Sequence, residues 1–223
     1  MRSGSGSDVG HRRPKNEDSF LSDGDRRLFV VADGMGGHPA GDVASREAVA
    51  ALDLALSNGA LESSDRMQAL TQALIKAHEA VVEAATTDPE KRGMGTTAVV
   101  AHLDADETTL TCAHIGDSRA YVLTDERLIR ITEDHVWGGR GGRSLTQAIG
   151  SSKKVEPEAA EVDLQPGDKV LLCTDGLTDM LADRDIRDVL LQDADAQALC
   201  DQLIETALER GGVDNITCIV IEV

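Results

Sequence analysis

Five short acidic motifs are spread along the 223-residue chain, and each places a carboxylate beside glycine or after an apolar, β-branched run. A strand ends at such a position, so the carboxylate can face a cleft instead of a core. Hard cations such as magnesium, manganese and calcium prefer carboxylate, carbonyl and water oxygens, and glycine lets its backbone approach an ion closely. The motifs therefore predict a hard-cation site. They are Asn16-Glu17-Asp18, Asp33-Gly34-Met35-Gly36-Gly37, Gly116-Asp117-Ser118-Arg119, Thr174-Asp175-Gly176-Leu177-Thr178-Asp179 and Asp214-Asn215.

Seven segments extend this pattern over almost the entire chain, from about Ser7 to Val223. They are, in order, Arg13-x-x-Asn16-Glu17-Asp18, Val30-Val31-Ala32-Asp33-Gly34-Met35-Gly36-Gly37, Gly95-Thr96-Thr97, Ile115-Gly116-Asp117-Ser118-Arg119, Thr132-Glu133-Asp134-His135, Leu172-Cys173-Thr174-Asp175-Gly176-Leu177 and Asp214-Asn215-Ile216-Thr217. Together they resemble the metal-dependent serine/threonine protein phosphatases, the PPM or type 2C family. One Asp-Gly pair indicates only a turn, whereas seven segments in the family's order are very hard to obtain by chance.

The resemblance implies a binuclear manganese or magnesium centre that hydrolyses phosphoserine and phosphothreonine in proteins. Uncatalysed phosphomonoester hydrolysis is extremely slow, and two adjacent divalent ions accelerate it by activating a water and clamping the attacking and phosphoryl oxygens. On the family's pattern, Asp33 bridges both ions and the Gly34 carbonyl binds one of them. Asp175 and Asp214 complete the protein ligands of the other ion.

Three residues of the first segment have supporting roles in the same pattern. Glu17 and Asp18 are expected to act on the metal centre mostly through ordered water. Arg13 is expected to hold the phosphate oxygens with its planar guanidinium, a task for which lysine is a poor substitute.

A third, weaker ion is also implied, held by Asp117 with Asp179 and Asp175. Asp179 lies four residues after Asp175 and could share an ion with it if a helical turn starts there. The alternative is that Asp117 caps a turn between two strands, as aspartate often does before serine. Ser118 and Arg119 are expected to be structural.

The proton donor to the leaving alcohol is not evident. Many eukaryotic members of the family have histidine where this chain has Met35, and methionine cannot donate a proton. Bacterial members often share the methionine, so the general acid becomes metal-bound water or another residue. His38 is close in sequence, but a structural role or an exposed side chain is expected for it. The other five histidines lack ligand-like spacing.

The segment from Val136 to Ser144 is shorter than the partly helical flap that family members usually carry there. It has four glycines among its nine residues, so it cannot easily hold a helix. A mobile loop near the active site, or a deletion, is predicted. The loop contains the only tryptophan together with Arg140 and Arg143, and substrate selection is the property it would affect.

Hydrophobic periodicity predicts an α+β protein. Strands are expected over residues 27–32, 96–103, 109–116, 120–124, 127–131, 159–163, 169–174 and 215–223, and helices over 40–57, 65–85, 183–192 and 194–210. Ser63 or Ser64 is expected to cap the second helix. This order suits antiparallel sheets with helices outside. The family resemblance implies a four-layer α-β-β-α sandwich. A single domain over residues 1–223 is expected, with a flexible Gly/Ser-rich start over 1–6.

Composition excludes some classes of function. The net charge of −18 argues against a nucleic-acid partner, because phosphate backbones require clustered lysine and arginine. The sequence contains no run of eighteen apolar residues, so it does not predict a helix that spans a membrane. The four cysteines lack metal-type spacing and are expected to be buried thiols in a reducing compartment. We therefore expect a cytoplasmic monomer whose partners are phosphorylated proteins and a cognate serine/threonine kinase that acts on the same substrates.

Two other classes of function compete with a phosphatase. One is a catalytically silent binding domain that keeps the fold, against which the intact Asp33, Asp175 and Asp214 argue. The other is a calcium-binding acidic protein. No run matches the Asp-x-Asp-x-Asp-Gly loop with glutamate at its twelfth position, so calcium binding of that kind is disfavoured.

Overall fold

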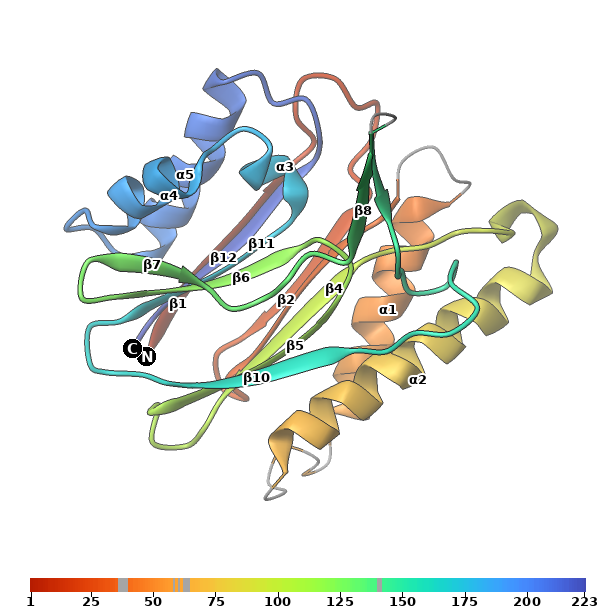
Figure 1. Ribbon diagram of the computed structural model, residues 1–223, viewed down its shortest axis with the longest axis horizontal. Helices are drawn as coiled ribbons and strands as arrows, with labels where there is room; N and C mark the ends of the chain where they lie inside the picture. Colours follow the sequence, from red (N-terminus) through yellow and green to blue (C-terminus); the bar gives the residue numbers. More distant parts are fainter. Residues whose placement is uncertain (36–39, 58, 60, 62–64, 140–141) are drawn as a thin grey trace.

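Two five-stranded antiparallel sheets form the centre of the molecule (Figure 1). This computed structural model describes residues 1–223 except 36–39, 58, 60, 62–64 and 140–141, and except the side chains of residues 139, 142 and 143. One sheet has the order β10 (Glu158–Asp163), β5 (Thr109–Ile115), β4 (Ala98–Leu103), β3 (Leu28–Asp33) and β2 (Asp18–Asp23). The other has the order β1 (Arg2–Asp8), β12 (Ile216–Glu222), β11 (Lys169–Cys173), β6 (Arg119–Thr124) and β7 (Arg127–Arg130).

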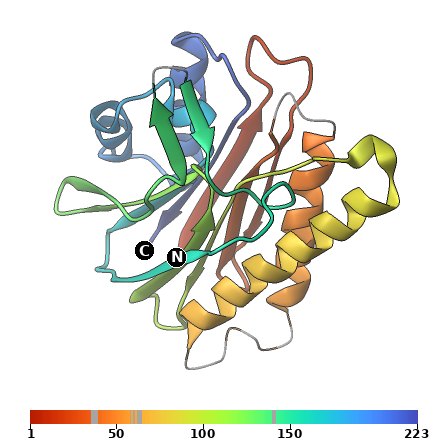
Figure 2. The same ribbon diagram turned by 45° about the vertical axis from the view of Figure 1, so that its right-hand side comes forward.

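Helices cover the outer face of each sheet. The β3-containing sheet is covered by α1 (Gly41–Ala55) and α2 (Arg66–Thr87), and a short 3-10 turn follows at Pro89–Lys91. The β12-containing sheet is covered by α3 (Asp175–Thr178), α4 (Asp183–Leu190) and α5 (Ala196–Glu209). Figures 1 and 2 show these helices on opposite sides of the paired sheets, so the four-layer α-β-β-α fold is confirmed. Within the described residues, no helix has the length and apolar character that a membrane crossing requires.

The period-two pattern of β3 explains how its sheet builds two cores. Leu28 and Val30 pack with α1 and α2 on one face, whereas Phe29 and Val31 pack between the two sheets. All four side chains are fully buried. Successive side chains of a strand point to opposite faces, so an uninterrupted apolar run is what a strand covered on both sides requires.

The N-terminal segment is ordered, and the expectation of a flexible start over residues 1–6 is wrong. Arg2–Asp8 forms β1, which pairs with β12 from Arg2↔Glu222 to Asp8↔Ile216. Its small residues let α5 pack closely, because a Cβ on Gly4 would collide with backbone atoms of Ala196 and Gln197. Glycine and serine here serve close packing of a helix on a strand rather than flexibility.

The start of α2 differs from the sequence-based expectation. Ser63 and Ser64 lie outside the described residues, and the helix is capped by Asp65, whose carboxylate accepts a hydrogen bond from the Gln68 N–H at 2.9 Å. Aspartate is as good an N-cap as serine because it offers the same kind of acceptor to a free backbone donor.

The shortened flap is a β-hairpin instead of a loop. Its strands are β8 (Val136–Gly139) and β9 (Gly142–Leu145), which pair from Val136↔Leu145 to Gly139↔Gly142. The described residues of this segment form strands and no helix, as predicted, whereas the prediction of a loop is wrong for its two strands. Arg140 lies outside the described residues, as does the side chain of Arg143. Figure 2 shows the hairpin standing out from the two sheets.

Candidate metal centre

Asp33 is held at the end of β3 by hydrogen bonds to the neighbouring segment. Its N–H donates to Thr97 Oγ1 at 3.1 Å, and the Thr97 N–H donates to the Asp33 carbonyl at 2.9 Å. The Thr97 hydroxyl also lies 2.6 Å from that of Ser118. These contacts fix the position of Asp33 and join the segments that carry Asp33 and Asp117.

Gly34 follows in a position that only glycine can occupy. Its N–H donates to the Glu17 carbonyl at 3.1 Å. A Cβ on Gly34 would collide with the carbonyl oxygens of Glu17 and Gly41. The backbone beside Asp33 is therefore packed closely between β2 and α1, as the Asp-Gly motif requires.

Asp175 and Asp214 come from the other sheet. Asp175 is the first residue of α3 and is separated from β11 by Thr174 alone, and Asp214 is separated from β12 by Asn215 alone. Asn215 connects this end of the sheet to the N-terminal segment, because its Oδ1 accepts the Glu17 N–H at 2.8 Å and its amide donates to the Lys15 carbonyl at 3.0 Å. Residues far apart in the sequence thus meet at one end of the two sheets.

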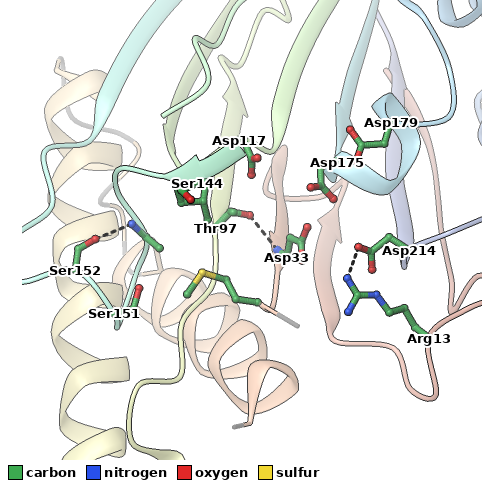
Figure 3. Close-up of a pocket in the computed structure, with 13 residues that line it drawn as sticks. Arg13, Asp33, Thr97, Asp117, Ser144, Ser151, Ser152, Asp175, Asp179 and Asp214 are labelled. Atoms are coloured by element: carbon green, nitrogen blue, oxygen red, sulfur yellow. Dashed lines mark hydrogen bonds and ion pairs between the residues drawn. The ribbon is translucent and has the colours of Figure 1, made fainter. Parts of the chain in front are cut away.

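A cavity of about 510 Å³ opens at this end of the sandwich (Figure 3). Six of the nine residues that the sequence nominated for the site line it, namely Arg13, Asp33, Asp117, Asp175, Asp179 and Asp214. Gly34 follows Asp33 directly. Glu17 and Asp18 do not line the cavity; Glu17 is buried, and Asp18 is half-buried. The remaining lining residues are Met35, Thr97, Ser144, Leu145, Ala148, Ser151 and Ser152.

Burial and mutual repulsion destabilise the charged forms of these carboxylates. Burial raises the pKa of Asp33 well above its usual range, and the charges of Asp18 and Asp175 raise it further. Burial also raises the pKa of Asp175 to about 7, with additional contributions from the charges of Asp117 and Asp179. A divalent cation relieves this repulsion, so the cluster has the chemistry of a hard-cation site.

The two carboxylate oxygens of Asp18 differ in their hydrogen bonding. Its Oδ2 accepts hydrogen bonds from Thr217 Oγ1 at 2.6 Å and from Thr174 Oγ1 at 2.9 Å. Its Oδ1 is buried and has no hydrogen-bond partner among the described residues. Burial raises the pKa of Asp18 to about 6. An unpaired, buried carboxylate oxygen beside Asp33 is suited to an ordered water or an ion.

The turn that carries Asp179 has the geometry that the sequence suggested. A helical turn begins at Asp175, and the Asp179 N–H donates to the Asp175 carbonyl at 2.7 Å. Both side chains face the cavity together with Asp117, which is 7% exposed (Figure 3). Three carboxylates at this side of the cavity form a second donor set beside that of Asp33.

Arg13 reaches the cavity and pairs with a nominated metal ligand. Its Nη2 lies 2.6 Å from Asp214 Oδ2, and this hydrogen bond raises the pKa of the guanidinium (Figure 3). Arg13 is thus placed to hold an anion at the cavity edge. Met35 also lines the cavity, and a Cβ on Gly95 would collide with its terminal methyl group. His38 lies outside the described residues.

Sequence spacing did not reveal a cluster formed by His114, His135 and Glu158. Their potential ligand atoms lie within 4.8 Å of one another, and the two imidazole rings stack with centroids 4.6 Å apart. The Gly116 N–H donates to His135 Nδ1 at 3.1 Å, so the neutral ring carries its proton on Nε2. That nitrogen therefore has no lone pair for an ion, and the cluster does not have the chemistry of a metal site.

Comparisons with known proteins identify the family. The family model described as protein phosphatase 2C matches residues 6–216, and the chain belongs to this family. The serine/threonine protein phosphatase PstP of Mycobacterium tuberculosis is 37% identical over 238 residues, which cover 100% of this chain and 45% of the relative. The serine/threonine phosphatase stp of Listeria welshimeri is 34% identical and covers 96% of this chain and 93% of the relative. The chain thus spans about half the length of the mycobacterial relative.

Solved structures agree with this assignment. The crystal structure of PstP from M. tuberculosis superimposes with a TM-score of 0.89 at 33% identity, covering 100% of this chain and 98% of that one. The catalytic domain of PstP in complex with two manganese ions has a TM-score of 0.86 at 34% identity, with 99% and 97% coverage. These neighbours share the fold described above.

Proposed function

We propose that this chain is a manganese- or magnesium-dependent enzyme that hydrolyses phosphoserine and phosphothreonine in proteins. The observation that carries the proposal is the convergence of Asp33, Asp175 and Asp214 on one cavity, where these half-buried carboxylates lie close enough for their charges to repel. Such a cluster is stable in its charged form only with cations beside it. Membership of the protein phosphatase 2C family and the two manganese ions in the PstP structure support the same conclusion.

The proposed ligand set follows the placement of the carboxylates. Asp33 would hold both ions, with the Gly34 carbonyl on one of them and with Asp175 and Asp214 on the other. When bound, the ions would supply a nucleophilic water near neutral pH and neutralise the phosphoryl oxygens. Glu17 and Asp18 would act on the metal centre through ordered water. The unpaired Asp18 Oδ1 would accept a hydrogen bond from such a water.

Other residues bind and orient the substrate. Arg13 stands at the cavity edge and would bind two phosphate oxygens with its planar fork once the phosphate competes with Asp214. Met35 cannot donate a proton, so the leaving alkoxide would take its proton from water in the open cavity. The Thr97 and Ser118 hydroxyls lock the position of Asp33, which keeps the ligand set pre-formed.

A third, weaker ion is part of the proposal. Asp117, Asp175 and Asp179 face one side of the cavity, and the charges of Asp117 and Asp179 both raise the pKa of Asp175. Three neighbouring carboxylates on one turn and one loop are a donor set for a hard cation. The turn-capping alternative for Asp117 does not account for the effect that its charge and that of Asp179 both have on Asp175.

Hydrolysis of p-nitrophenyl phosphate with EDTA, manganese, magnesium or calcium tests this function against its two alternatives. The proposal predicts turnover with manganese or magnesium and none with EDTA. A catalytically silent domain would give no turnover with any ion. A calcium-binding protein would be stabilised by calcium without turnover. Either of those results would overturn the proposal.

The biological setting is also proposed here. All four cysteines are free and buried, and the Cys200 and Cys218 sulfur atoms lie 3.3 Å apart without a bond, which suits a reducing, cytoplasmic compartment. The protein would act as a single-domain monomer on phosphoproteins that a serine/threonine kinase has modified. Size-exclusion chromatography with light scattering tests the monomer, and a dimer mass would contradict it.

A further inference from the structure

The hairpin of β8 and β9 forms part of the cavity wall. Ser144 and Leu145 of β9 both line the cavity. Figure 3 shows Ser144 beside the cavity, and Figure 2 shows the hairpin projecting outward from the sheets. Its base is held to the body of the protein, because the Thr146 N–H donates to the His135 carbonyl at 2.8 Å and the His135 N–H donates to the Gly116 carbonyl at 2.9 Å. An ordered wall therefore stands at the mouth of the cavity.

Trp137 lies on the face of the hairpin that includes Ser144. The two residues are directly opposite in the antiparallel pairing, and residues directly opposite in such a pair place their side chains on the same face. Their Cβ atoms are about 5 Å apart in such a pair. The indole is therefore one cross-strand step from a residue that lines the cavity.

The indole is exposed and is absent from the three buried hydrophobic clusters. Trp137 is 78% exposed, and it is the only tryptophan of the chain. Among the described residues, no other large hydrophobic side chain is more exposed, and Leu54 on α1 follows at 75%. A large apolar surface at the rim of a binding cavity is typical of a contact with a partner, because aromatic side chains provide much contact area with little conformational freedom to lose.

We propose that Trp137 binds an apolar side chain located one or two residues from the phosphorylated serine or threonine of the substrate. This inference rests on the proposed phosphatase function. Neighbouring Cα atoms of a peptide are 3.8 Å apart, so a phosphate in the cavity places its flanking residues within reach of the hairpin face. The cavity is lined by five aspartates, which repel acidic flanks, whereas an apolar flank gains the area that the indole offers.

Matched peptides test this contact directly. The substrates are phosphothreonine peptides with glycine on every flank, with one leucine before or after the phosphothreonine, or with one arginine at the same positions. Wild type should show kcat/KM about tenfold higher for the better leucine peptide than for the glycine peptide, since burial of one apolar side chain contributes that order of free energy. In Trp137→Ala this preference should disappear, while hydrolysis of the glycine peptide stays within about twofold.

Two further variants test whether the leucine preference requires an aromatic side chain at this position of the hairpin. Trp137→Phe should retain most of the preference for leucine because it keeps an aromatic face. Leu54→Ala removes an equally exposed apolar side chain from α1, whose Leu54 does not line the cavity, and should leave the preference unchanged. An unchanged leucine preference in Trp137→Ala would overturn the inference. The inference would also be overturned if Trp137→Ala abolished a preference for the arginine peptide as large as that for the leucine peptide. Such a result would indicate that the indole binds a cation instead of an apolar side chain.

Binding gives a second readout that does not depend on turnover. Because Trp137 is the only tryptophan, its fluorescence reports on this position alone. A non-hydrolysable phosphonate form of the leucine peptide should shift the emission to shorter wavelength, and the glycine form should not. No shift with the leucine form would contradict the proposal. If wild type hydrolyses none of the peptides with manganese, the phosphatase function itself fails, whereas hydrolysis without dependence on Trp137 refutes only the indole contact.

Discussion

Arg13 and Asp214 form an ion pair across 201 residues of sequence, with 2.6 Å between Nη2 and Oδ2. The pair joins a residue proposed to bind phosphate to one proposed to bind metal. Arg13 is 38% exposed and Asp214 is 29% exposed, so water screens the pair and a metal ion or a phosphate can compete for either partner. Phosphate binding by Arg13 and metal binding by Asp214 are therefore linked through this ion pair.

Replacing Arg13 should weaken substrate binding more than the chemical step. Arg13→Ala removes a charge-assisted contact with the phosphate that already exists in the ground state, so KM should rise about ten- to a hundredfold. Manganese affinity should not fall, because the variant frees Asp214 from its cationic partner. Arg13→Lys serves as the matched control and should be intermediate, since it keeps the charge without the planar fork. A large loss of kcat at unchanged KM would contradict this role.

Replacing Asp117 should separate the third ion from the other two. Asp117→Ala should lower kcat about ten- to a hundredfold, the size of effect that loss of a supporting metal contact has elsewhere. Calorimetry should still find two tightly bound manganese ions per chain. Asp193→Ala removes an exposed carboxylate that does not line the cavity and controls for net charge. Unchanged rate together with unchanged metal count in Asp117→Ala would remove the third ion from the account.

The stabilising effect of manganese should grow with pH. Asp18, Asp33 and Asp175 have pKa values raised above those of the unfolded chain, so without metal the folded state binds more protons than the unfolded state between about pH 4 and pH 7. Their contribution to the stability of the metal-free protein is therefore present below pH 4 and is lost as pH rises through 7. Bound cations replace those protons and remove this loss.

Melting temperatures measured with EDTA and with millimolar manganese at pH 5.0 and pH 7.5 check this expectation. The difference between the two conditions should be larger at pH 7.5, where a hundredfold excess of metal over its Kd stabilises by about 2.7 kcal/mol. Comparing the two conditions at one pH cancels the contributions of exposed groups elsewhere. A manganese effect that is equal at both pH values, or larger at pH 5.0, would contradict the assignment.

His135 should act as a positioning residue for Asp117. It binds Gly116 twice, through the Gly116 N–H to its Nδ1 at 3.1 Å and through its own N–H to the Gly116 carbonyl at 2.9 Å. His135→Leu leaves the buried Gly116 N–H without an acceptor, which should cost about 1 to 3 kcal/mol and lower kcat with little change in KM. His135→Asn offers an amide oxygen in place of Nδ1 and should restore part of kcat.

A buried histidine that does not line the cavity provides the control. His102 is 5% exposed, and burial lowers its pKa to about 4. His102→Leu should change the melting temperature without changing kcat. If His135→Leu also loses only stability, with kcat of the folded protein unchanged, then its contact with Gly116 is structural and does not position Asp117.

The sequence predicted the elements whose cause is local. A short stretch of sequence shows the apolar runs of β3, β4 and β12, because each of these strands is buried on both faces. It also shows the helical spacing of apolar residues in α1 and α5, because each of these helices is buried on one face. The acidic motifs at strand ends were visible for the same reason. Their convergence on one cavity came from the family resemblance, since no local pattern shows that Asp33 and Asp175 meet.

The missed features depend on contacts between distant segments. β1 has no apolar period because its glycines accommodate α5, and its pairing with β12 joins the two ends of the chain. β2 was hidden because its burial does not alternate: five of its six residues are half-buried, and only Phe20 is exposed. The β8 hairpin contains glycines that suggest disorder, yet backbone pairing orders its strands. The contact between His135 and Gly116 has no signature in sequence spacing.

The central claim is that one cluster of carboxylates in the cavity makes phosphate release depend on metal. The most direct test measures initial rates of phosphate release from a phosphothreonine peptide during a manganese titration, for wild type and for Asp33→Asn. The account predicts that the wild-type rate rises from the EDTA baseline to saturation, while Asp33→Asn remains more than about a hundredfold slower at every manganese concentration. Wild-type turnover in EDTA, or substantial turnover by Asp33→Asn, would contradict it.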